Sequence, residues 1–139
     1  MIKTELETEH KGSKFTIIHC KGALDSFHNA MKSVDAKRRK SFANSIIHQI
    51  KRLANGERMT KENFPQEGNL PKRPGQHNTK KFNALKKIPI RGYCWLSEKH
   101  SNTYYISHYV HKDYKRLKER DSTRVENNWK RIEENGDER

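Results

Sequence analysis

The hydrophobic residues of this sequence change their spacing near residue 80, and this change limits the folds that the chain can adopt. Before it, Phe42, Ile46 and Ile50 recur at the spacing of one face of a helix. After it, apolar and polar residues alternate in three segments up to residue 111, which is the period of strands with one buried face. The chain is therefore predicted to be an α+β protein whose helices and strands are largely segregated along the sequence.

Shorter signals complete the predicted order of elements. The expected strands cover 15–20, 80–88, 90–98 and 103–111, and the expected helices cover 24–34, 36–54 and 114–132. Asn55-Gly56 is typical of a left-handed helix end, whereas Asp121-Ser122 leaves open whether the last helix is continuous. We expect a small antiparallel sheet of about four strands, with two N-terminal helices on one face and a C-terminal helix.

These elements are expected to form a single domain over residues 14–134. Residues 1–13 are polar and predict a flexible leader, and residues 135–139 are expected to form a short tail. Residues 56–79 contain three of the four prolines and no periodic pattern, which predicts a long, irregular, basic loop. Leu, Ile, Val and Phe account for only 25 of the 139 residues, so the core of this domain must be small.

Positive charge is concentrated in the middle of the chain. Residues 71–118 carry a net charge of +10, compared with +13 for the whole protein. A basic surface attracts polyanions, so this segment favours a nucleic-acid partner, although a merely solubilising surface would have the same composition. No apolar run is long enough to cross a bilayer and no strongly basic amphipathic helix stands out, so no membrane partner is expected. Two cysteines and a charged N-terminus without a signal-peptide pattern predict a cytoplasmic protein with reduced thiols.

Alternation assigns the residues of the last two strands to two faces of the sheet. Ile90 and Ile106 are expected to face the helices, together with His108. The opposite face would carry aromatic and basic side chains, including Arg91 and His111. Such a face suits single-stranded nucleic acid, because bases stack on the rings while cations hold phosphates; alternatively, the rings pack as a second, minor core. The predicted nucleic-acid-binding residues are Lys80, Lys81, Lys86, Lys87, Tyr93, Trp95, Tyr105, Tyr109, Lys115 and Arg116.

A dense polar segment follows the last predicted strand. A histidine such as His111 can move a proton near neutral pH, and Asp113 could orient it. Arg91 and Lys112 could neutralise the charge that builds on phosphate oxygens in a transition state. These groups suit metal-free RNA cleavage, in which the 2′-OH of the RNA attacks the adjacent phosphate. The alternative is a charged strand-to-helix junction with no catalytic role.

No metal or other cofactor is expected. His108 and His111 are three residues apart, so on a strand they would point to opposite faces. Cys20 and Cys94 have no cysteine nearby in the sequence with which to share a zinc ion.

Two segments resemble the RelE/ParE superfamily of bacterial toxins, and HigB-type toxins in particular. Residues 103–117 (TYYISHYVHKDYKRL) are similar to the end of those proteins, where a final strand leads into a His-x-acid-Tyr segment. Residues 90–95 (IRGYCW) lie where members of the family place an arginine entering the central strand, and the order of elements over 15–134 is also similar. The resemblance implies a RelE-like fold and an mRNA interferase, an endoribonuclease that cleaves mRNA on the ribosome and inhibits translation. It also implies an acidic antitoxin as partner, with operator DNA bound only through the antitoxin complex.

Carried over by position, the resemblance also implies roles for individual residues. His111 would be the general acid or base, with Asp113 orienting it or contacting RNA. Tyr114 would stack on or position a base, and Arg91 and Lys112 would stabilise the transition state. Two alternatives stay open: a non-catalytic toxin of the same fold that poisons gyrase, and a general single-stranded RNA-binding module.

Overall fold

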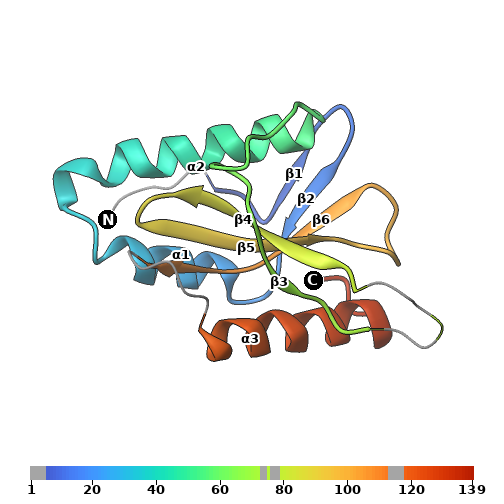
Figure 1. Cartoon of the computed structure of the whole chain (residues 1–139). Helices are drawn as coiled ribbons and strands as arrows, with labels where there is room; N and C mark the ends of the chain where they lie inside the picture. Colours follow the sequence, from blue (N-terminus) through green and yellow to red (C-terminus); the bar gives the residue numbers. More distant parts are fainter. Residues whose placement is uncertain (1–5, 73–74, 76–78, 113–117) are drawn as a thin grey trace.

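A mixed sheet of six strands forms the centre of the protein (Figure 1). The computed structural model describes residues 6–72, 75, 79–112 and 118–139. The strands are β1 (Glu9–Lys11), β2 (Thr16–His19), β3 (Gln66–Asn69), β4 (Lys81–Lys87), β5 (Ile90–Leu96) and β6 (Thr103–His111). Their order across the sheet is β1-β2-β6-β5-β4-β3; β2 and β6 are parallel, and all other neighbours are antiparallel.

The α+β class is confirmed, but the prediction of an antiparallel sheet of about four strands is wrong. The two additional strands lie in segments without a β-like pattern. β1 lies within residues 1–13, which were expected to form a flexible leader, and β3 lies within the expected loop over 56–79. Both are edge strands of three or four residues, and they form because β2 and β4 offer unpaired backbone groups to them.

Within the described residues, three α-helices flank the sheet: α1 (Ala23–Met31), α2 (Arg39–Ala54) and α3 (Glu119–Trp129). A 3-10 turn, in which the side chain of Asp35 accepts a hydrogen bond from the backbone N–H of Lys37, leads into α2. Gly56, with φ of +72°, follows the end of α2 in the predicted left-handed conformation. α3 runs through Asp121 and Ser122 without interruption. No helix within the described residues combines the length and the apolar character needed to cross a membrane.

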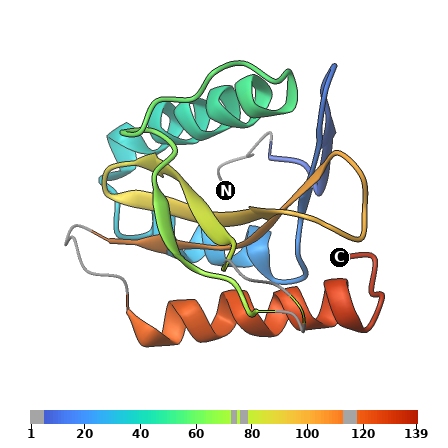
Figure 2. The same ribbon diagram turned by 45° about the vertical axis from the view of Figure 1, so that its right-hand side comes forward.

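The helices cover both faces of the sheet. Phe27, Phe42 and Ile46 of α1 and α2 pack with Ile90 and Ile106 on one face. α3 packs against the opposite face, as Figure 2 shows with α2 above the sheet and α3 below it. The face that was expected to carry aromatic and basic side chains is therefore covered by α3, because the apolar stripe of this helix needs a surface to pack against.

A β-bulge in β6 changes which of its residues face which helices. Tyr93 pairs with His108 and Cys94 pairs with Ile106, so Ser107 is an extra residue in β6. The side chains before the bulge follow the predicted alternation, but those after it are reversed. His108 and Val110 therefore lie on the α3 side, whereas Tyr109 and His111 lie on the side of α1 and α2.

Candidate nucleic-acid interface

The rings that were predicted to stack on RNA bases lie in a second core beneath α3. Trp95 and Tyr105 stack with their ring centroids 5.5 Å apart, and Tyr93 meets Phe82 edge-on at 5.7 Å. Trp129 of α3 belongs to the same buried cluster. Since Tyr93, Trp95 and Tyr105 are at most 1% exposed, bases cannot reach them, and the alternative of a minor core describes this face correctly.

Tyr109, the fourth predicted ring, is buried on the other face because of the bulge. It lies opposite Gly92, where an added Cβ would come within 2.5 Å of the tyrosine ring. Its hydroxyl donates a hydrogen bond of 2.7 Å to Nε2 of His19, whose Nδ1–H donates to the carbonyl of Glu7. Burial lowers the pKa of His19 to about 4 and raises the pKa of Tyr109 well above its usual value, so the pair is neutral at pH 7.

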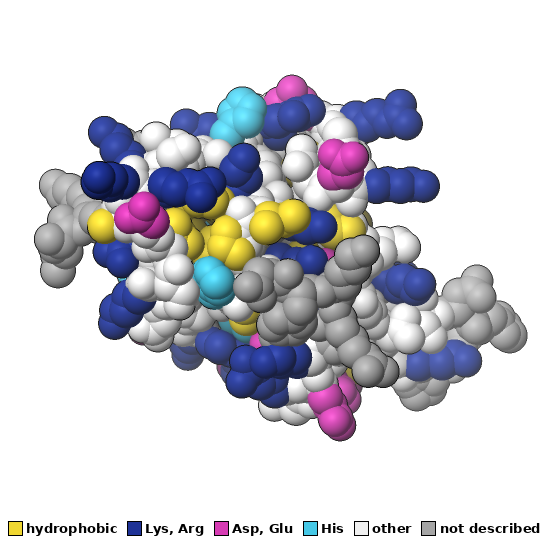
Figure 3. Space-filling view, turned by 60° about the vertical axis from the view of Figure 1, so that its left-hand side comes forward, with side chains coloured by type: hydrophobic (Ala, Val, Ile, Leu, Met, Phe, Trp, Pro, Cys, Tyr) yellow, Lys and Arg dark blue, Asp and Glu magenta, His cyan; other side chains and the backbone are white. Residues whose placement is uncertain are grey.

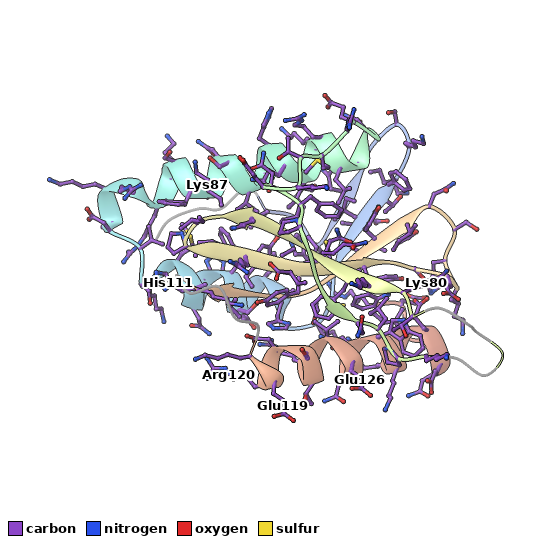
Figure 4. The ribbon with its side chains drawn as sticks, in the orientation of Figure 1. Lys80, Lys87, His111, Glu119, Arg120 and Glu126 are labelled. Carbon is purple, nitrogen blue, oxygen red and sulfur yellow. The ribbon has the colours of Figure 1, made fainter. Side chains whose placement is uncertain are left out.

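The four lysines that were predicted to grip RNA lie at two ends of β4 rather than in one group. Lys80 and Lys81 are at one end and Lys86 and Lys87 at the other, which separates the pairs by about 20 Å along the strand. Figure 4 shows Lys80 and Lys87 at opposite ends of the sheet. Lys80 is also paired with Glu98 at 2.7 Å. Only the end with Lys86 and Lys87 is close to the candidate catalytic residues.

Arg91 and Lys112 are buried in a polar cluster on the α3 side of the sheet. The guanidinium of Arg91 donates to the carboxylate of Glu67 at 2.7 Å, and both side chains are nearly inaccessible. Lys112 is only 1% exposed; burial and then the positive charge of Arg91 lower the pKa of its amine, while Glu67 and Asp121 oppose this shift. The two predicted cations therefore do lie near each other, but neither faces solvent.

The cluster continues toward α3 through a series of hydrogen bonds that was not predicted. The amide of Asn128 donates to the hydroxyl of Ser107, which donates to Nδ1 of His108, and Nε2–H of His108 donates to Asp121 at 3.1 Å. Burial lowers the pKa of His108. Burial opposes ionisation of Asp121, but the hydrogen bond from His108 and nearby positive charges lower the pKa of its carboxyl. Ser107 and His108 are fully buried, so this Ser-His-Asp series joins α3 to the sheet and is closed to a substrate.

His111 lies at the same end of the sheet but on the opposite face from Arg91. It pairs with Ile90 across β5 and β6, so its half-buried side chain is on the side of α1 and α2. The prediction that His111 and Arg91 share a face is wrong, because the bulge at Ser107 reverses the end of β6. The candidate residues Asp113, Tyr114, Lys115 and Arg116 lie outside the described residues.

A basic groove along the outer side of α2 was not predicted. Its volume is about 700 Å³. Figure 3 shows Lys and Arg side chains gathered over α2. The sequence signal was a polar stripe at four-residue spacing, from Lys40 through Asn44 and His48 to Arg52, on the helix whose other side is core. The groove is lined by Lys37, Lys40, Ser41, Asn44, Ser45, His48, Gln49, Arg52, Asn63 and Lys87.

Within the described part of the chain, no group of three or more His, Cys, Asp or Glu residues is placed to hold a metal ion. Cys20 and Cys94 are both buried as free thiols, and burial raises the pKa of each. Comparison of the chain with protein-family models, with curated proteins and with solved structures found no match. A function for this protein therefore has to rest on the side chains described above.

Proposed function

We propose that this protein is the toxin of a toxin–antitoxin pair and an endoribonuclease of the RelE type. Its substrate would be mRNA on the ribosome, its site of action the cytoplasm, and its inhibitor an acidic antitoxin. The observation that carries the proposal is the pairing of β5 with β6, which brings Arg91, His111 and Lys112 to one end of the sheet. The order of β2, α1, α2, β4, β5, β6 and α3 along the chain also supports it, because the resemblance to RelE-type toxins rests on this layout.

His111 is the acid–base group in this proposal, since it is the one of these three residues that is not buried. The 2′ oxygen of the RNA attacks the adjacent phosphorus, and the bond from phosphorus to the 5′ oxygen breaks. The 2′-OH loses a proton and the 5′ oxygen gains one, and His111 mediates one of these transfers. Arg91 and Lys112 supply positive potential from behind the site as negative charge builds on the phosphate oxygens, and Glu67 fixes the position of Arg91.

The proposal is tested by mapping RNA 5′ ends after expression of the wild type and of H111A. We expect new mRNA ends with the wild type and a loss of roughly 10²–10⁴-fold in cleavage rate with H111A. H28A is a matched control, because His28 is an exposed histidine on α1. No new ends with the wild type, or equal cleavage by wild type and H111A, would refute an enzymatic function. Accumulated DNA topoisomers without mRNA cleavage would instead identify a gyrase-poisoning toxin.

One observation favours a second candidate function, a non-catalytic module that binds single-stranded RNA. Arg91 is paired with Glu67, and Lys112 is covered, so both candidate supporting cations are withdrawn from solvent. The groove along α2 needs neither of them to bind a polyanion. In this case purified protein would bind RNA with a steep dependence on salt and would never cleave it.

A further inference from the structure

We infer that the basic groove along α2 holds the phosphate backbone of a single RNA strand and directs it toward His111. The binding surface stands on its own contacts, and only the direction toward His111 rests on the proposed endonuclease function. Of the predicted nucleic-acid-binding residues that the structure describes, Lys87 alone lines this groove.

The charge of the groove suits a polyanion. Lys37, Lys40, Arg52 and Lys87 are cations, and His48 adds a side chain that can be charged. Among the residues described as lining it, none is acidic. Arg52 lies 3.9 Å from Glu57, but that pair is largely exposed, and such pairs exchange readily for a stronger partner. The remaining lining side chains are hydroxyls and amides, which can hydrogen-bond to phosphate and sugar oxygens.

The length of the groove suits several nucleotides. Lys40, Asn44, His48 and Arg52 follow one another at four-residue intervals on α2, so the row spans about 18 Å. A stacked strand advances about 3.4 Å per phosphate, so about five phosphates would lie along this row. Asn63 and Lys87 come from outside the helix and complete the lining.

The lining favours RNA over an acidic protein. The described lining residues include no aliphatic residue and no Phe, Tyr or Trp, whereas protein interfaces have an apolar centre. Ser41 and Asn44 are exposed side chains of the lining that can hydrogen-bond to a ribose 2′-OH, the group that distinguishes RNA from DNA.

The sheet register links the groove to the proposed acid–base residue. Lys87, which lines the groove, pairs with Ile90, and Ile90 pairs with His111. These three residues lie in one row on one face, so Lys87 and His111 are two strand spacings, or about 10 Å, apart. Figure 4 shows both residues at the same end of the sheet. An RNA strand that leaves the groove over Lys87 therefore comes next to His111.

The test measures binding of a labelled eight-nucleotide oligouridylate whose integrity is checked on a gel afterwards. The variant K40Q/R52Q removes two groove cations, and the control K21Q/K130Q removes two exposed cations outside the groove. Each phosphate contact contributes a factor of about five at 0.1 M salt, so the groove variant should bind about 25-fold more weakly. The slope of log K against log salt should become shallower by about 1.4, and the control should change affinity less than threefold.

Several results would overturn the assignment. Equal losses in the two variants would show that only net charge matters, and no loss in either would place the RNA elsewhere. An eight-nucleotide oligodeoxyuridylate and polyglutamate are measured alongside the RNA. Equal affinity for the DNA octamer would overturn the choice of RNA, and tighter binding of polyglutamate would identify an acidic protein as the occupant. Failure of the groove and failure of the endonuclease proposal are distinguishable. If K40Q/R52Q loses binding while the wild type cuts nothing, only the endonuclease fails; if the wild type cuts but K40Q/R52Q binds normally, only the groove fails.

Discussion

The two faces of the sheet bury apolar side chains in similar ways but place their charges differently. On the side of α1 and α2 the cations stay in solvent, along the outer surface of α2. On the α3 side the ionisable residues Glu67, Arg91 and Asp121 are themselves buried or nearly so, and each is paired. An exposed cation can bind a polyanion without first losing a partner, whereas a buried cation needs its partner for the protein to stay folded. The cations along α2 are thus available to a ligand, whereas the buried cation Arg91 beneath α3 is held by its partner Glu67.

This difference has a consequence for the proposed reaction. Arg91 and Lys112 lie on the α3 side, where Arg91 is paired with Glu67, whereas His111 lies on the other side, two strands from Lys87 of the basic groove. Within the endonuclease proposal, His111 would touch RNA, whereas Arg91 and Lys112 would act through their electric field. Variants that remove one buried charge should therefore lower the free energy of unfolding more strongly than they weaken RNA binding.

Removing Glu67 should have the largest effect on stability. E67A leaves the guanidinium of Arg91 buried without its carboxylate and close to the charge of Lys112, so unfolding free energy should fall by about 3–5 kcal/mol. The double variant R91M/E67L removes both charges and should stay within about 1 kcal/mol of the wild type. Urea unfolding measures both values. If E67A lowers the free energy of unfolding by less than about 1 kcal/mol, the buried guanidinium of Arg91 does not need Glu67 as its partner.

Acidification should destabilise the protein through its buried neutral histidines. The folded pKa of His19 is about 4 and the ordinary value is 6.5, so the unfolded chain takes up the proton first as pH falls. The contribution of His19 to the free energy of unfolding is fully present above about pH 6.5 and is lost progressively as the pH falls toward 4. The total loss is on the order of 3 kcal/mol. The free energy of unfolding, measured with urea at pH 7, 5.5 and 4, should fall with pH in the wild type and with the same slope in the exposed control H28Q. An unchanged slope in H19Q would contradict the assignment to His19.

Much of the fold could be predicted from the sequence because its signals are local. β6 covers Thr103–His111 as expected, and Asn55-Gly56 follows α2 as expected. These features depend on alternation and on left-handed turn residues, which act over a few positions. The α+β class follows from them.

The site could be predicted only in part because its decisive features depend on distant residues. The bulge at Ser107 has no residue pattern of its own, yet it moves Tyr109 and His111 to the other face. Glu67 lies in a segment without periodicity and meets Arg91 only after β3 has paired with β4. The spacing of polar residues predicts the outward face of α2, but the groove also needs Asn63 and Lys87, which come from outside the helix.

A smaller loss is expected where α3 is joined to the sheet. D121A leaves the Nε2–H of His108 buried without an acceptor, which should lower the unfolding free energy by about 1–3 kcal/mol. The exposed variant R124A on the same helix is the control and should stay within about 0.5 kcal/mol of the wild type. If urea unfolding shows equal values for D121A and R124A, the buried hydrogen bond does not fasten α3.

The smallest effect on stability is expected on the α2 side, where neutralising charge should cost almost nothing. K40Q/R52Q changes two side chains that line the groove and breaks only the weak contact with Glu57, so its unfolding free energy should stay within about 0.5 kcal/mol of the wild type. A slight gain is expected at low salt, because a chain with a net charge of +13 repels itself, and this gain should disappear at 0.5 M salt as screening increases. Urea unfolding at low salt and at 0.5 M salt measures both. A loss of more than about 1 kcal/mol would mean that the fold depends on the contacts of these cations, as it depends on the partner of Arg91 beneath α3, and the contrast between the two faces would no longer hold.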